Sequence, residues 1–137
     1  MGEIRVKVRL TNATDEELAR SGSLSKDKVR FYEADAVVDT GAVRSVIPTH
    51  VLEKLGATIR GQRVAEYADG RKDTVGITGA IIFDILGRDT LEEALVLGDE
   101  VLIGQTVLEK LDLLADCANG RLVPNPAHPD QPVSKVK

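Results

Sequence analysis

Apolar and charged residues alternate along the first stretch of the chain, from residue 4 to residue 10. Isoleucine, valine or leucine occupies the even positions, and arginine or lysine occupies the odd ones. A period of two is typical of a strand that buries one face. The polar stretch that follows predicts a short helix over residues 14–20, with Thr14 as N-cap and Glu17 as the reciprocal acid of a capping box. The chain then returns to a strand pattern over residues 28–38.

Two more short segments are typical of helices. Residues 49–55 begin with Thr49 as the expected N-cap and are followed by Gly56, a residue type that often ends a helix. Residues 105–111 place three apolar side chains on one helical face. Residues 44–47, just before the first of these helices, contain β-branched residues and are followed by a proline. This pattern predicts a short strand.

Two Gly-containing dipeptides predict β-hairpins. Asp69-Gly70 stands between the strand-like runs 62–68 and 71–77, and such a pair between strands is a strong hairpin signal. Asn119-Gly120 stands near the end of the chain, and Asn-Gly is the preferred two-residue hairpin turn. It predicts a second hairpin over residues 113–123.

The remaining apolar runs, 80–86, 95–97 and 101–103, add further strands. The chain of 137 residues is therefore expected to be mostly β and to form one domain over residues 1–123. Four of its five prolines crowd into the tail, residues 124–137. Because proline cannot join a sheet as an interior strand residue, we expect this tail to be extended or mobile.

Composition excludes several classes of protein. The formal net charge of −4 argues against nucleic acid as a partner, since no basic face is supplied. No apolar run approaches the ~20 residues needed to cross a bilayer, and the start of the chain lacks an apolar signal core, so we expect a cytoplasmic protein. The single cysteine, Cys117, excludes an internal disulfide and is expected to be a small core residue.

Histidine usage makes a metal site improbable. His50 and His128 are the only two histidines, and they do not form a His-x-x-x-His pair. We therefore expect no metal and no cofactor. A Ser-His-Asp or Cys-His site stays an open alternative, although the chain has no nucleophile elbow of the Gly-x-Ser-x-Gly type.

The candidate chemistry lies at Asp39, directly after the short apolar run 36–38. A carboxylate at the end of a buried strand has little water, so the fold must supply hydrogen bonds or a second group that shares its charge. Thr40 offers a hydroxyl to nearby backbone, and Gly41 permits a tight turn. The purely structural interpretation is a strand followed by an Asx-turn, which is common in β-rich proteins.

Asp39, Thr40, Gly41 and Ala42, preceded by two valines, resemble the active-site loop of the retropepsin-like (clan AA) aspartic proteases, as a bacterial-type single-domain member. The resemblance covers approximately residues 29–123. It implies a closed or partly open retropepsin-like β-barrel with a flap hairpin and one or two short helices. The chain departs from the retroviral pattern just after the loop, where Val43 and Arg44 replace the acidic pair usual in several retroviral enzymes.

The resemblance assigns a role to each residue of the loop. It makes Asp39 the catalytic carboxylate, and it has Thr40 bond across a dimer axis. Gly41 would let backbone approach the aspartates, and Ala42 would line the site. Pepsin-like proteases carry a hydroxyl residue at the place of Ala42, so we expect this chain to work well above the strongly acid range.

The resemblance also assigns the hairpin around Asp69-Gly70 as a flap that closes over bound peptide. Tyr67, Asp69 and Gly70 are its candidate substrate-binding residues, although the hairpin evidence alone favours an ordinary surface hairpin in which Tyr67 packs across the strands. Two aliphatic residues and a glycine are expected beside the catalytic loop, and Gly104 fits this place. Gly87 ends a similar run, but the helix and final hairpin follow Gly104.

Aspartic proteolysis needs two carboxylates that face one water. The chain has one Asp-Thr-Gly and no second Asp-Ser-Gly or Asp-Thr-Gly. A homodimer would supply the second Asp39, and we expect residues 4–10 and 113–123 to form much of its interface, because these strands would otherwise leave sheet edges open. The sequence thus predicts an aspartic endopeptidase whose partners are itself and a peptide or protein substrate. The alternatives are a non-catalytic retropepsin-like dimerisation or peptide-binding module and an unrelated small β-rich domain.

Overall fold

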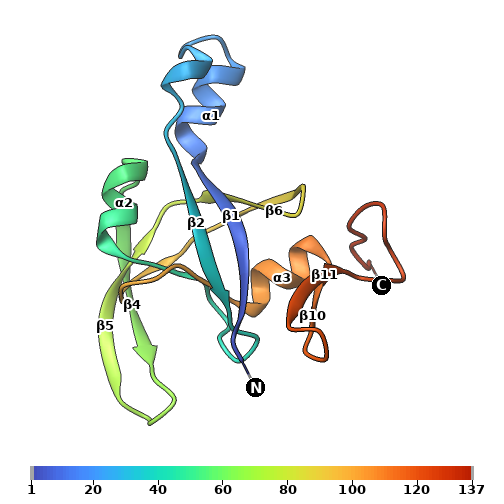
Figure 1. Cartoon of the computed structure of the whole chain (residues 1–137). Helices are drawn as coiled ribbons and strands as arrows, with labels where there is room; N and C mark the ends of the chain where they lie inside the picture. Colours follow the sequence, from blue (N-terminus) through green and yellow to red (C-terminus); the bar gives the residue numbers. More distant parts are fainter. Residues whose placement is uncertain (1, 137) are drawn as a thin grey trace.

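The computed structural model describes residues 2–136, and its main feature is one curled sheet of nine strands (Figure 1). The order across this sheet is β4-β5-β8-β3-β9-β2-β1-β6-β7, and β10 and β11 form a separate pair. The strands are β1 (Ile4–Asn12), β2 (Phe31–Val38), β3 (Val46–Ile47), β4 (Ile59–Glu66), β5 (Lys72–Thr78), β6 (Ile81–Ile85), β7 (Arg88–Glu92), β8 (Leu95–Val96), β9 (Leu102–Ile103), β10 (Leu113–Asp116) and β11 (Arg121–Pro124). The helices are α1 (Ala13–Arg20), the short 3-10 helix η1 (Lys26–Lys28), α2 (Thr49–Leu55) and α3 (Gln105–Leu111). The expectation of a mostly β chain is confirmed, and the half-barrel curl of the sheet is compatible with a retropepsin-like barrel.

The alternating stretch at the start of the chain is a strand, as predicted. Ile4, Val8 and Leu10 are buried, and the charged residues between them are exposed. The strand β1 pairs with β2 along nearly its whole length and with β6 through residues 9–12. It therefore lies inside the sheet, and the expectation that residues 4–10 leave a sheet edge open is wrong for residues 9 and 10.

The arm that carries α1 projects from the body of the molecule in Figure 1. Its helix begins one residue earlier than predicted, and the Thr14 capping box is not the cap. The side chain of Asn12 accepts the backbone N–H of Asp15 at 2.9 Å instead, and its own amide donates to the carbonyl of Leu55 in α2. Asp15 is buried against Arg30, whose guanidinium bonds lower the pKa of this carboxyl. These contacts fasten the base of the arm to the body.

The buried core lies between the sheet and the two later helices. It joins residues that are far apart in sequence and carries no aromatic side chain other than Phe83 among its fully buried members. Those members include Leu10, Ile47, Leu55, Ile81, Phe83, Ile85, Ile103, Leu108 and Leu111. Burial of one such side chain stabilises the fold by on the order of 1.5–3 kcal/mol.

Of the described helices, none is long and apolar enough to cross a membrane.

The apolar run that ends at Gly87 is a hairpin strand. Leu86 and Gly87 both have positive φ, at 53° and 79°, and form the tight turn between β6 and β7. Leucine is an uncommon residue in this conformation, which explains why the turn carries no ordinary sequence signal. Gly87 therefore lies in a hairpin turn between β6 and β7.

The last hairpin differs in detail from its prediction. Asp116 pairs with Arg121, so four residues, 117–120, make the turn, and the expected two-residue Asn-Gly turn is wrong. Asn119 bonds through its side chain and its backbone N–H to Asp116, which closes the loop. Cys117 lies in this turn and is exposed, so it is not a core residue.

The first part of the proline-rich tail folds back onto the body. Asp112 accepts hydrogen bonds from the Asn125 amide at 3.0 Å and the Val133 N–H at 3.1 Å, and its carboxylate lies 2.6 Å from His128 Nδ1. Buried Arg88 donates to the carbonyl of His128 at 2.7 Å. The tail is therefore held to the body at these points.

Candidate functional site

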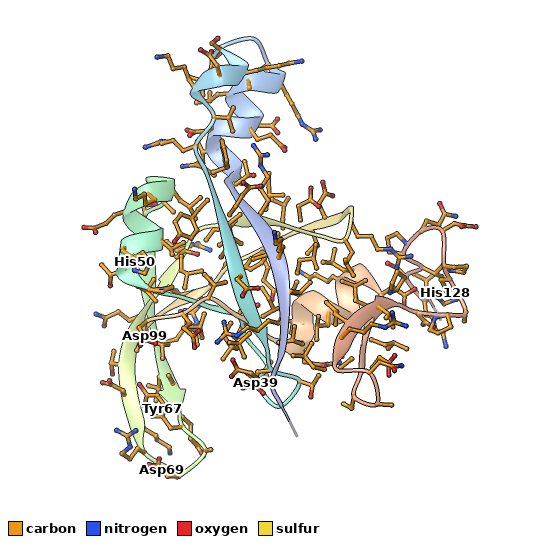
Figure 2. The ribbon with its side chains drawn as sticks, in the orientation of Figure 1. Asp39, His50, Tyr67, Asp69, Asp99 and His128 are labelled. Atoms are coloured by element: carbon orange, nitrogen blue, oxygen red, sulfur yellow. The ribbon has the colours of Figure 1, made fainter. Side chains whose placement is uncertain are left out.

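Asp39, labelled in Figure 2, directly follows β2. The end of this strand runs parallel to β9. Its backbone N–H donates to the carbonyl of Ile103 at 2.9 Å, which continues the pairing one residue past the strand. Its carboxylate Oδ1 accepts the N–H of Gly41 at 2.9 Å, and its carbonyl accepts the N–H of Ala42 at 3.2 Å. The side chain is half-buried, while Thr40 at the tip of the turn is exposed. The turn thus holds one oriented carboxylate at the surface of the sheet.

The loop after Asp39 rests on the start of α3. The N–H of Gln105 donates to the carbonyl of Ala42 at 2.7 Å, and the N–H of Gly104 donates to the hydroxyl of buried Ser45 at 2.9 Å. A Cβ placed on Gly104 would lie 2.6 Å from the carbonyl carbon and oxygen of Arg44. Only glycine allows this approach to the loop backbone, and the role of Gly104 beside a catalytic loop stays a prediction.

A buried charged group lies under the same loop. Thr106 donates its backbone N–H and its hydroxyl to the carbonyl of Val43, at 3.1 and 2.9 Å, and its hydroxyl also contacts Glu92. Glu92 is buried and pairs with Lys110 Nζ at 2.8 Å. These residues fix the loop from below. Sequence analysis missed them, because Glu92 and Thr106 come together only through the packing of β7 against α3.

A groove of about 640 Å³ opens beside Asp39. Its floor is aliphatic, because Val46 pairs with Leu95 on one side and with Leu102 on the other, so the three side chains share one face of the sheet. The hairpin β4–β5 forms the opposite wall. The lining residues are Asp39, Gly41, Ala42, Val43, Arg44, Val46, Val64, Ala65, Glu66, Tyr67, Ala68, Leu95, Leu97 and Leu102.

The candidate flap residues divide into two groups. Tyr67 lines the groove, and Figure 2 shows it on the same hairpin as Asp69, which lies nearer the tip. Asp69 and Gly70 do not line the groove. Asp69 accepts the N–H of Arg71 at 3.0 Å and its Nε at 2.9 Å, which lower the pKa of this carboxyl, and the Arg71 guanidinium lies 4.7 Å from the centre of the Tyr67 ring. Asp69 therefore shapes the turn next to Tyr67.

Two charged residues of the groove were not predicted as site residues. Arg44 lies at the Asp39 wall, and Glu66 lies on the hairpin wall. Arg44 Nη1 is 3.3 Å from Glu93 Oε1, and Arg60 Nη1 is 4.0 Å from Glu93 Oε2. The pKa of Glu93 is lowered, first by a hydrogen bond to its own backbone N–H and then by these arginines. No local sequence signal could have found this arrangement, since it joins three separate segments.

Neither histidine lies at the groove. His50 packs edge-on against Tyr32, and His128 binds Asp112 at the tail. Figure 2 shows both side chains well apart from Asp39. Across residues 2–136, no group of three or more histidine, cysteine, aspartate or glutamate side chains is placed to hold a metal ion.

Comparison with known proteins finds a likeness in fold. No protein-family profile and no curated protein sequence matches the chain. Among solved structures, the foamy viral protease-reverse transcriptase in complex with an RNA/DNA hybrid is similar, with a TM-score of 0.51 and 18% sequence identity. The match covers 77% of this chain and 11% of that longer one. At this identity the likeness shows a shared fold.

Proposed function

We propose that the chain is an aspartic endopeptidase that works as a homodimer. The observation that carries this proposal is the place of Asp39, an oriented carboxylate at the rim of a groove that a hairpin faces from the other side. We infer that the part shared with the foamy viral chain is its protease, because the match is short and Asp39 lies in a loop of the protease type. The groove, the loop and the hairpin are what a peptidase of this kind requires.

The chemistry requires a second carboxylate, which the partner's Asp39 would supply across a two-fold axis. The two carboxylates share one proton, because like charges at contact distance do not both ionise. The ionised one takes a proton from water, and the water oxygen attacks the peptide carbonyl carbon while the protonated one donates to the carbonyl oxygen. The carboxyl group that took the proton from water gives it to the amine nitrogen as the C–N bond breaks. The other carboxylate takes a hydroxyl proton from the tetrahedral intermediate, which restores the shared proton and releases a carboxylic acid and an amine.

The residues around Asp39 support this reaction in distinct ways. The N–H of Gly41 binds the carboxylate, and the bonds from Gln105 and Thr106 to the loop hold it in place. A fixed loop matters because a catalytic group displaced by about 1 Å can cost a hundredfold in rate. Tyr67 faces the groove from the hairpin and is the flap residue we expect to contact bound peptide.

The alternative is a dimeric peptide-binding module without catalysis. It shares the groove and the fold, and it differs only in how close the two Asp39 side chains come. Hydrolysis of a mixed peptide library by the purified full chain separates the two functions. Asp39→Asn keeps the shape of the side chain and removes the shared proton, so hydrolysis should fall to background.

A matched control is Asp99→Asn, which changes an exposed carboxylate outside the Asp39 groove and should leave hydrolysis unchanged. Sedimentation should give a mass near twice 14.8 kDa for both variants. A dimer that binds peptides but cleaves none would establish the binding module. Full activity in Asp39→Asn would refute the catalytic role of this residue, and a strict monomer with activity would refute the shared site.

A further inference from the structure

The groove beside Asp39 carries a cation that hydrolysis itself does not use. We propose that Arg44 binds an acidic side chain of the substrate, so that the groove selects peptides with glutamate or aspartate close to the cleaved bond. This inference rests on the proposed peptidase function and names its substrate class. It is carried by the position, the charge and the hydrogen-bonding capacity of Arg44.

The backbone of Arg44 is fixed against the body of the protein. Its carbonyl group packs on Gly104, and the next residue, Ser45, is buried and bonded at 2.9 Å to the N–H of that glycine. Arg44 lies two residues before Val46 in the chain, and both line the groove. The side chain therefore starts from a rigid point close to Asp39, and a peptide seated on the aliphatic floor would pass within its reach.

The charge around Arg44 is not balanced. Arg44 and Arg60 share the single carboxylate of Glu93, at 3.3 and 4.0 Å. Because the pKa of Glu93 is lowered, this carboxylate is ionised at neutral pH and contributes one negative charge against two positive ones. The cluster of Arg44, Arg60 and Glu93 therefore keeps one net positive charge, which attracts an anionic side chain to the Arg44 end of the groove, away from the carboxylate of Glu66.

The guanidinium of Arg44 also has donors to offer. Within residues 2–136, its one hydrogen bond is that of Nη1 to Glu93, and the side chain is 43% exposed. A guanidinium has five N–H donors in a planar fork that matches a carboxylate in a two-bond arrangement. A substrate carboxylate would use donors that Glu93 leaves available.

The opposite wall makes the preference depend on position. Glu66 lines the groove on the hairpin, and an acidic side chain placed against it would be repelled. An acidic residue is therefore favoured at the substrate position that meets Arg44 and disfavoured at the position that meets Glu66. A general attraction of acidic peptides would not show this contrast.

The test uses the full chain and short peptides with a central Leu-Leu pair, in which a single glutamate or glutamine is moved through the flanking positions. The ratio of kcat/KM for the glutamate peptide to that for the glutamine peptide is measured at each position. At one position the ratio should reach about fivefold, a value fitting a partly exposed ion pair, and it should decline as salt is raised. The same peptides, fluorescently labelled, are also titrated against Asp39→Asn to measure binding without cleavage.

Variants assign the preference to Arg44. Arg44→Lys should keep a reduced preference at the same position, Arg44→Gln should abolish it, and Arg44→Glu should reverse it in favour of a lysine peptide. Arg63→Gln is the matched control, because Arg63 is an exposed arginine on β4 that does not line the groove. It should leave the ratio unchanged.

The outcomes separate this inference from the proposed function. Cleavage with equal rates for glutamate and glutamine peptides at every position would overturn the inference and leave the peptidase standing. Selective, Arg44-dependent binding without any cleavage by the wild type would support the inference and refute the peptidase. A preference that survives Arg44→Gln, or the absence of both cleavage and binding, would overturn the role of Arg44.

Discussion

Replacing Gly104 with alanine tests whether the Asp39 loop depends on close packing against α3. The added Cβ would lie 2.6 Å from the carbonyl carbon and oxygen of Arg44 and 2.9 Å from the carbonyl oxygen of Val43. Ordinary contact begins at 3.4 Å, so the backbone of Arg44 would have to retreat by about 0.8 Å, the difference from 2.6 Å. Gly104 has φ of −92°, which any residue adopts, so the penalty is steric and comes from the neighbouring backbone.

We expect Gly104→Ala to lower the free energy of unfolding by about 1–3 kcal/mol, the usual range for overpacking a rigid site. Because the displaced segment follows Asp39 by a few residues, peptide hydrolysis should fall by up to about a hundredfold. Denaturant unfolding at one fixed chain concentration measures the first effect, and kcat/KM on a cleaved peptide measures the second. Gly79→Ala is the matched control, because a Cβ there meets nothing within 4 Å, and it should change neither quantity appreciably.

The result that would refute this reasoning is a Gly104→Ala variant as stable and as active as Gly79→Ala. It would mean that the loop has room to move away from α3 at no cost. A variant that loses stability but keeps full activity would show that the packing supports the fold and does not position Asp39.

Two further predictions concern the supports of the loop and the tail. Thr106→Val keeps the shape of the side chain and removes the hydroxyl that contacts the carbonyl of Val43 and the buried carboxylate of Glu92. Denaturant unfolding should show a loss of about 1–2 kcal/mol, and an unchanged midpoint would contradict a stabilising role of this hydroxyl. The pKa of Asp112 is lowered, first by the Asn125 amide and then by the Val133 N–H, so its contribution is complete above the ordinary carboxyl pKa and is lost as pH falls through the lowered value. The protection factors of the amides in residues 125–133, which compare the exchange rate with the intrinsic rate at the same pH, should therefore fall on acidification and, at neutral pH, in Asp112→Asn. Equal protection in wild type and variant would show that the tail is held by other contacts.

Local patterns were enough to place most of the secondary structure. The alternation over residues 4–10 fixes a strand, because a period of two matches one buried face whatever lies beyond it. Gly56 and Asp69-Gly70 mark a helix end and a hairpin, since each supplies a backbone conformation that few other residues adopt, and both glycines have positive φ in the structure. The loop from Asp39 to Ala42 was found in the same way, as a short contiguous motif.

Long-range packing decided what no window of sequence could. Asn12 replaces Thr14 as the cap of α1 because its amide also reaches the carbonyl of Leu55 in a helix far along the chain. The order of the strands places β1 inside the sheet, although its alternating pattern is equally typical of an edge strand. An alternating pattern reports which face is buried and says nothing of which strand lies alongside.

The residues of the candidate site fall into the same two groups, those indicated by local sequence and those brought together by long-range packing. The sequence by itself indicated the Asp39 carboxylate and its glycine turn, because these depend on adjacent residues, whereas the glycine beside the loop was expected only from the family resemblance. Only the tertiary structure decided that Arg44 and Glu66 face one groove and that Glu92 lies beneath the loop. Those groups belong to strands and turns that meet through sheet curvature and helix packing, and the free energy of that arrangement is distributed over the whole core.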